Sequence, residues 1–343
     1  MAKFYLAKIL NKKKIMDLTK LKETLKFEPS FRLKQATQAI FVGLINNWNK
    51  ATNFSTRLRG VLNENCPLSI KGELFQSTKE NSTKALITLN DGLKIETVLL
   101  KHSDGRNTIC LSSQAGCPMG CLFCATGKMG FKRNLTVEEI IEQAVLFARL
   151  LKKESEQINN LVFMGMGEPF LNYNNVLEAV KILNNKNHLN IGARHISIST
   201  IGIIEGIKKL ANQPLQINLA ISLHAPSDEL RIQIIPANKK RPIEKIIDAV
   251  NYYIDKTGRR VMIEYIMIKD FNDSPKHARQ LAELLKKINN SLYFVNLISY
   301  NSTAKFKPSD STKIKLFKEI LIKQKVETTL RYRFGQDVKA ACG

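Results

Sequence analysis

The chain has 343 residues, of which 44% are hydrophobic and 24% are charged, as in an ordinary soluble globular protein with a substantial core. It contains no apolar run long enough to span a membrane and no secretory signal, so we expect a cytoplasmic protein. The formal net charge of +23 indicates an anionic partner, with nucleic acid as the first candidate and a lysine-rich solvated surface as the alternative.

The first part of the chain has helical periodicity. Apolar positions recur every three or four residues over 35–50 and 55–64, which predicts a small separate helical module over residues 1–82. Two β-rich runs then flank Asn90-Asp91-Gly92 within residues 84–101. This pattern predicts a β hairpin over 83–102 that links the module to the rest of the chain.

From about residue 106, short β-branched runs alternate with longer amphipathic stretches. The clearest helix is expected over 136–153, with Thr136 as its N-cap and two glutamates in its first turn. Six β/α repeats predict an α/β core over 103–335, either a doubly wound sheet or an incomplete barrel, followed by a tail over 336–343. The predicted strands cover 107–113, 159–165, 194–200, 215–223, 260–268 and 292–298.

Several polar and flexible residues follow these strands. The carboxyl ends of parallel strands meet at one edge of a sheet, so we expect these residues to lie near one another. Taken alone, each has an ordinary interpretation as a tight turn or a strand-terminating polar residue. They are Gly167 and Glu168 after the second strand, Ser199 at the end of the third, Ser222, Leu223 and His224 after the fourth, and Asn301 past the sixth.

Three of the six cysteines lie in the stretch CPMGCLFC, residues 117–124, at a spacing of C-x3-C-x2-C. Six cysteines are too few and too unevenly spread for a disulfide framework in a chain of this length. Clustered thiolates can hold a zinc ion or three irons of a cubane cluster, in either case leaving one coordination position without a cysteine.

The spacing of Cys117, Cys121 and Cys124 resembles that of the radical S-adenosylmethionine (SAM) enzymes. The resemblance implies a [4Fe-4S] cluster on these cysteines, whose fourth iron binds SAM. It also implies that SAM is contacted by the polar residues at the strand ends, namely Gly167, Glu168, Ser199, Ser222, Leu223, His224 and Asn301.

Longer motifs make the resemblance more specific. Residues 110–140, 164–176 and 221–231, together with the closing AACG, resemble the RlmN/Cfr family of radical SAM RNA methyltransferases from about residue 84 to the end. This implies a partial (β/α)6 barrel and methylation of adenine in RNA. ISLHAP is more typical of the RlmN branch, which acts at C2 in 23S rRNA and beside the anticodon in tRNA, than of the Cfr branch, which acts at C8.

The resemblance also assigns roles to three further residues. Cys342 would accept a methyl group from a first SAM, and a second SAM would generate the radical that joins this methylene to RNA. Cys110 would release the product by forming a transient disulfide with Cys342, and Glu96 would remove the adenine C2 proton. The ordinary alternatives are a buried strand thiol, a tail thiol and an exposed strand carboxylate. Cys66 matches nothing and is expected to be structural.

The partners implied are 23S rRNA, tRNA and a reductant such as flavodoxin or ferredoxin, with the enzyme a monomer and residues 1–82 as the RNA-docking module. Two alternatives from other classes stay open. One is a radical SAM enzyme that acts on a small molecule or peptide, and the other is a nucleic-acid-binding protein with a structural zinc site.

Overall fold

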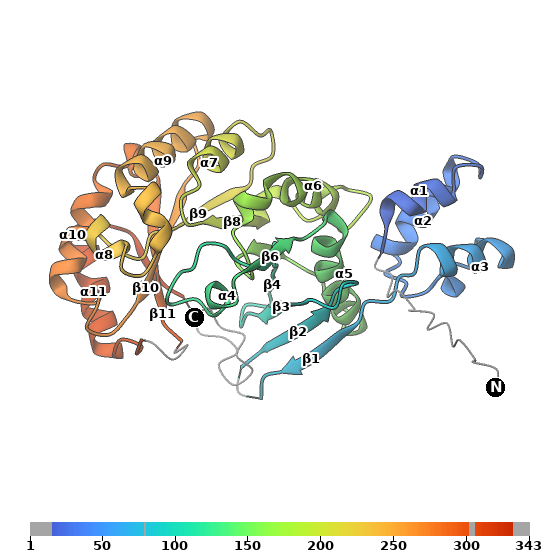
Figure 1. Ribbon diagram of the computed structural model, residues 1–343, viewed down its shortest axis with the longest axis horizontal. Helices are drawn as coiled ribbons and strands as arrows, with labels where there is room; N and C mark the ends of the chain where they lie inside the picture. Colours follow the sequence, from blue (N-terminus) through green and yellow to red (C-terminus); the bar gives the residue numbers. More distant parts are fainter. Residues whose placement is uncertain (1–15, 79, 302–305, 332–343) are drawn as a thin grey trace, which may run out of the picture.

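A curved ten-stranded sheet organises the molecule (Figure 1), which we describe from a computed structural model over residues 16–78, 80–301 and 306–331. The strand order is β1-β2-β3-β4-β7-β8-β9-β10-β11-β12; neighbours are antiparallel up to β4 and parallel from β4 onward. The strands are β1 Gly72–Gln76, β2 Ser82–Thr88, β3 Lys94–Lys101, β4 Asn107–Cys110, β7 Asn160–Phe163, β8 Ile196–Thr200, β9 Asn218–Ser222, β10 Val261–Met267, β11 Tyr293–Ser299 and β12 Thr328–Leu330, with β5 Gln114–Gly116 and β6 Phe131–Asn134 forming a separate pair.

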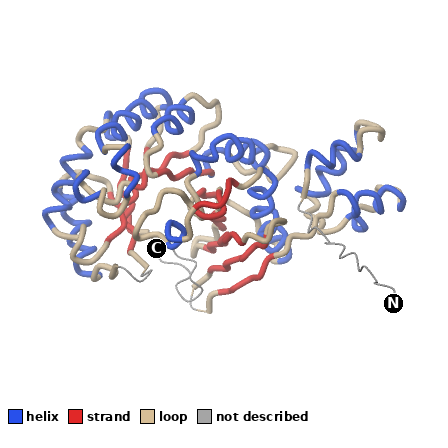
Figure 2. The backbone as a smooth tube through the Cα atoms, viewed as in Figure 1, coloured by secondary structure: helices blue, strands red, loops and turns tan. Residues whose placement is uncertain are grey.

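The longer helices from α5 onward lie along the convex side of the sheet, the short α8 lies at the strand ends, and α1 to α3 form a group beyond α5 (Figure 1 and Figure 2). Among the described residues, no helix has the length and apolar character needed to cross a bilayer. The α-helices are α1 Leu18–Thr24, α2 Phe31–Phe41, α3 Thr56–Asn65, α4 Ala125–Lys128, α5 Val137–Lys153, α6 Tyr173–Asn184, α7 Ile204–Ala211, α8 Asp228–Arg231, α9 Ile243–Thr257, α10 Pro275–Leu285 and α11 Ser311–Lys323.

The six strands expected from the β/α alternation are β4, β7, β8, β9, β10 and β11, and all six are parallel neighbours. The expected cap of α5 is also confirmed, because the Thr136 side chain accepts from the Glu139 backbone and the Glu139 side chain accepts from the Thr136 backbone. The predicted α/β fold, with a parallel sheet curved into an incomplete barrel, is therefore confirmed.

Two expectations about the N-terminal part need correction. The helices end at Asn65, and residues 72–76, expected to be helical, form strand β1. The predicted hairpin exists as β2 and β3, but it does not merely link two units: β3 pairs with β4, so the hairpin extends the main sheet. The GELFQ segment of β1 is exposed at every position and shows no helical apolar stripe, so backbone pairing with β2 determines its conformation.

The helical group packs closely against the core. Its buried side chains belong to the same hydrophobic cluster as those of the barrel, and the Phe41 ring stacks on His188 with centroids 4.5 Å apart. On α5, the buried Glu142 accepts a 2.6 Å hydrogen bond from the Met16 backbone. These contacts fix the position of the helical group beside α5.

Candidate functional site

The cysteine motif forms a loop between β5 and the short helix α4. Pairing of β5 with β6 brings the two sides of this loop together, and the Cys117 backbone N–H donates to the Gly130 carbonyl at 3.1 Å. Gly116 has a φ of +79°, and a Cβ there would lie 1.8 Å from the Gly130 oxygen, so only glycine fits. Cys124 is the N-cap of α4.

The thiols of Cys117, Cys121 and Cys124 are all free and line one cavity. Burial raises the pKa of Cys117 to about 12, and burial followed by the neighbouring cysteines also raises the pKa of Cys121. The thiols of Cys117 and Cys121 therefore ionise only when a cationic group compensates the thiolate charge. A metal centre supplies such charge, so the donor set fits one.

The described residues include no group of three His, Cys, Asp or Glu side chains arranged to hold a single metal ion. A cubane cluster takes each thiolate at a different iron, which spaces the sulfurs more widely than tetrahedral zinc does. Cys117, Cys121 and Cys124 together supply three thiols, the number that a cubane cluster with one open iron would take from the protein.

Glu168 follows β7 and joins the ends of two strands. Its carboxylate accepts from the backbone N–H groups of Phe170 at 3.1 Å and Ile201 at 2.9 Å. Burial nevertheless raises the pKa of Glu168 to about 7. Gly167 has a φ of +100°, and a Cβ at this position would lie 2.5 Å from the Gln114 side chain. The backbone after β7 can therefore pass the cavity only with glycine here.

A buried hydrogen-bond network joins β8, β9 and β10. Glu264 on β10 accepts from the Ser199 hydroxyl at 2.8 Å and the Ser222 hydroxyl at 3.4 Å. Arg331 donates to the other Glu264 oxygen at 3.3 Å. The sequence analysis missed Glu264, although a single acidic residue inside the apolar run RVMIEYIMI was a usable signal.

His224 follows β9 with a φ of +62°, a conformation that turns the chain sharply at the strand end. Its Nδ1 accepts from the Ile266 backbone N–H at 3.2 Å, which assigns the ring proton to Nε2. Burial, followed by the charge of Arg231, lowers the pKa of His224 to about 3, so the ring is neutral. Phe123 from the cysteine loop contacts this ring edge-on, with centroids 4.9 Å apart.

Arg231 is a second residue that the sequence analysis missed. It is fully buried and donates to the carbonyls of Ile201, Ser222 and Leu223. These carbonyls lie where β8 and β9 end, so one guanidinium satisfies backbone acceptors from both strands. Arg231 thereby fixes the rim of the cavity. The sequence signal that could have identified it was its place at the end of the motif ISLHAPSDELR.

Cys110 and Glu96 line the same cavity, which has a volume of about 250 Å³. Cys110 is buried at the end of β4, and its carbonyl accepts from the Thr97 hydroxyl at 2.8 Å. The Glu96 carbonyl accepts from Ser112 at 2.5 Å, while its carboxylate forms a 3.2 Å ion pair with Lys84. The cavity thus combines the cysteine triplet with a fourth thiol and a half-exposed carboxylate.

Most of the expected site residues lie at this cavity. The exceptions are Leu223, which is buried beneath the rim, and Asn301, which follows β11 and is not among the lining residues. Cys342 lies outside the described residues. The expected residues that do line the cavity are Glu96, Cys110, Cys117, Cys121, Cys124, Gly167, Glu168, Ser199, Ser222 and His224.

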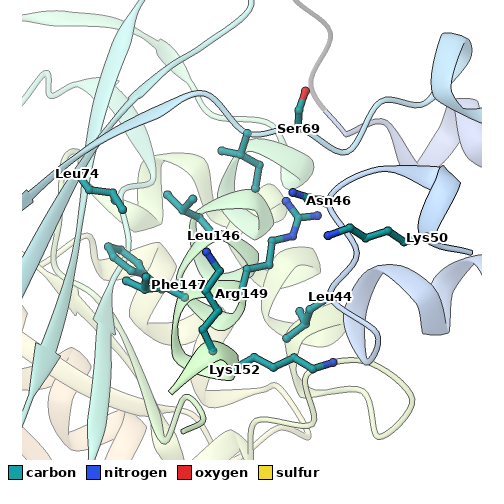
Figure 3. A pocket seen from close by; sticks show the side chains of 12 residues that line it. Leu44, Asn46, Lys50, Ser69, Leu74, Leu146, Phe147, Arg149 and Lys152 are labelled. Carbon is teal, nitrogen blue, oxygen red and sulfur yellow. The ribbon is translucent and has the colours of Figure 1, made fainter. Parts of the chain in front are cut away.

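A larger cavity of about 430 Å³ lies elsewhere, between α5 and the helical group (Figure 3). Arg149 donates to the carbonyls of Ile45 and Leu68, and Lys152 donates to the carbonyls of Val42 and Gly43. These bonds satisfy carbonyls that follow α2 and, at Leu68, α3, and they hold the helical group against α5. None of the described residues that line this cavity carries a thiol or a carboxylate, so its size does not make it the candidate reaction site.

The Glu264 network should contribute measurably to stability. Replacing Glu264 with glutamine removes a buried charge opposite Arg331 and leaves two serine hydroxyls with a weaker acceptor, so we expect a loss of about 1–3 kcal/mol in the free energy of unfolding. Chemical denaturation measures this. Glu327→Gln is the matched control, because Glu327 forms a 2.7 Å pair with Arg260 at an exposed position. Equal effects of the two variants would contradict the network's contribution.

Comparisons with known proteins agree with this geometry. A profile of the radical SAM superfamily matches residues 111–294. A protein of Dictyoglomus thermophilum named "Probable dual-specificity RNA methyltransferase RlmN" is 45% identical over 92% of this chain and 90% of its own length. A protein of the same name from Carboxydothermus hydrogenoformans is 47% identical over 92% of both chains. The crystal structure of a radical SAM methyltransferase from Sphaerobacter thermophilus has a TM-score of 0.90 and 39% identity, covering 96% of this chain and 97% of that one.

Proposed function

Because this chain belongs to the radical SAM superfamily and, within it, to the RlmN family of RNA methyltransferases, we propose that it methylates C2 of adenine in 23S rRNA and in tRNA. The single observation that best supports this function is the presence of Cys110 and Glu96 in the cavity of the cysteine triplet. A generic radical SAM enzyme needs only the triplet. An RNA methyltransferase that forms a covalent protein–RNA adduct also needs a thiol that releases the product, and Cys110 would be that thiol.

The cofactor would be held at the carboxyl edge of the sheet. Cys117, Cys121 and Cys124 would each bind one iron of a [4Fe-4S] cluster, and Gly167, Glu168, Ser199, Ser222 and His224, which line the cavity, would contact SAM. The SAM contacts expected of Leu223 and Asn301 stay a prediction, since neither residue lines the cavity. When bound, cluster and SAM supply the carbon-radical chemistry that an unactivated methyl group requires, with two SAM molecules per turnover. Glu264 and Arg231 position the serines and the strand ends that surround SAM.

The remaining residues handle the methyl group and the proton. Cys342 carries the methyl group as a thioether, which becomes the link between protein and RNA. Glu96 takes the C2 proton, and the ammonium of Lys84 holds its carboxylate beside the cavity. The Cys110 thiolate then attacks the Cys342 sulfur: an S–S bond forms, the S–C bond to RNA breaks, and its electron pair stays with the RNA carbon, which takes up a proton.

Substrate binding fits the charge of the chain. The net charge of +23 favours folded RNA, from which the reacting adenine must be extruded to reach a cavity inside the barrel. The helical group of α1 to α3 is the proposed RNA-docking module. A reductant such as flavodoxin or ferredoxin supplies electrons to the cluster, and the proposed enzyme acts as a monomer.

Mass spectrometry of nucleosides from digested RNA tests the function. In cells that lack the modification, expression of this protein should produce 2-methyladenosine in both 23S rRNA and tRNA, while the Cys342→Ala variant should produce none. Detection of 8-methyladenosine instead would assign the chain to the C8 branch. Absence of any methyladenosine, with the iron–sulfur cluster intact, would contradict RNA methylation.

A further inference from the structure

Strands β1, β2 and β3 extend the main sheet beyond β4. One face of this extension leads directly out of the cavity. Phe75 on β1 lies opposite Lys84 on β2, and Leu86 lies opposite Glu96 on β3. Side chains two residues apart on a strand share a face, so Phe75, Lys84 and Glu96 project from the same side of the sheet. Glu96 lines the cavity, and the other two residues continue its surface outward.

The other face of this extension is covered only in part, since Ala85 and Ile87 on β2 are buried while the β1 residues stay exposed. A Cβ at Gly72 would lie 3.4 Å from the Leu146 side chain of α5, which places the face of Gly72, Ala85 and Ile87 against that helix. Phe75 belongs to the opposite face and is 40% exposed. Its ring is therefore accessible on the side of the sheet that α5 leaves uncovered.

Lys84 connects the exposed ring to the cavity. Its ammonium lies 5.6 Å from the centroid of the Phe75 ring and 3.2 Å from a Glu96 carboxylate oxygen. Only 12% of the Lys84 side chain is exposed, and these two contacts orient its ammonium. An ammonium has three N–H donors, so Lys84 can hold Glu96 and still donate to a second anion.

A single exposed aromatic residue needs no special explanation. Here, however, the aromatic ring lies next to a fixed cation, and both share a face with a residue of the reaction cavity. An aromatic platform beside a cation is the combination that proteins use to bind a base and a phosphate of single-stranded RNA. Two strand spacings, about 10 Å, separate the strand of Phe75 from that of Glu96, which suits a nucleotide next to the reacting one.

We infer that Phe75 and Lys84 form a binding subsite for a nucleotide that flanks the reacting adenine: its base stacks on the Phe75 ring and its phosphate binds the Lys84 ammonium. This inference rests on the proposed RNA methylation. The subsite holds the flanking strand in place while the target base occupies the cavity. The Phe75 ring therefore contributes to RNA affinity and not to the chemistry itself, whereas Lys84 also holds the Glu96 carboxylate.

Substitutions of Phe75 test the stacking contact. Base–aromatic stacking of the usual strength predicts that Phe75→Ala raises the KM for RNA about 5- to 150-fold. Phe75→Leu keeps an apolar side chain but has no ring face, so it should lose most of the same affinity. Phe75→Trp keeps an aromatic ring and should bind RNA about as tightly as the wild type. The kcat should change less than about twofold in all three, since Phe75 does not line the cavity. Phe294→Leu is the matched control, because Phe294 also has a cation over its ring, Arg260 at 5.0 Å, but lies near the amino end of β11.

Two binding measurements identify the contacts directly. An RNA stem-loop with 2-aminopurine beside the target adenine should lose fluorescence on binding the wild-type protein, and this quenching should disappear in Phe75→Leu. Lys84→Gln should remove one phosphate contact. The slope of log K for RNA binding against log salt concentration should therefore become less steep by about 0.7. Melting temperature and iron content of each variant verify that fold and cluster are intact.

The outcomes separate the subsite from the function. If the wild-type protein methylates RNA but Phe75→Leu retains both wild-type KM and quenching, the subsite is wrong and the proposed function stands. A loss of kcat without a change in KM would also overturn the subsite. If the wild-type protein binds and quenches the probe without methylating RNA, the subsite stands and the proposed reaction fails.

Discussion

Replacing Cys110 with alanine should convert the protein from a catalyst into a covalent trap for RNA. Cys110 lines the cavity but lies outside the cysteine triplet that we propose binds iron. Without it, the methyl group can still be loaded on Cys342 and joined to adenine, but no thiolate attacks the sulfur to release the product. We expect turnover to fall to zero and up to one RNA per chain to remain attached. A nuclease-sensitive upward shift on a denaturing gel measures this.

A second buried cysteine provides the control. Cys66 lies in the helical group, where its carbonyl accepts from the Trp48 indole at 2.7 Å, and it is remote from the cavity. Cys66→Ala should lose some stability but turn over without an adduct. Cys342→Ala should give neither product nor adduct. Normal turnover by Cys110→Ala, or absence of adduct despite an intact cluster and a methylated Cys342, would show that Cys110 is not the resolving thiol.

Removal of any one thiol from the triplet should abolish both the cluster and all methylation. Anaerobically reconstituted wild-type protein should be brown and contain about four irons per chain, as one cubane requires. Cys117→Ala, Cys121→Ala and Cys124→Ala should each lose the visible absorbance and most of the iron. The reason is the same at each position: in the proposed cluster, each thiolate would be the only protein ligand of its iron.

Metal analysis separates this result from the zinc alternative. Iron and acid-labile sulfide should accompany activity, and Cys110→Ala should keep both at the wild-type level. Full activity in a preparation that contains zinc and no sulfide would disprove the cluster.

Much of the architecture could be predicted from local pattern. The alternation of β-branched runs with amphipathic stretches identified all six parallel strands, and Thr136 with Glu139 marked the start of α5. Strand order then implied that residues after Phe163, Thr200 and Ser222 meet at one edge, because parallel strands share their carboxyl edge. The spacing of the three cysteines by itself indicated a metal centre.

The sequence by itself thus determined the order of β/α elements, the thiol triplet and the family, because these depend on short-range periodicity and spacing. Only the tertiary structure decided which residues of distant strands meet. Glu264 joins Ser199 and Ser222 across three strands, and β1 exists because its backbone pairs with β2 despite an exposed sequence. Phe75, Lys84 and Glu96 share one face only because the register of β1, β2 and β3 aligns them. Register and side-chain convergence depend on long-range pairing, which local propensity does not specify.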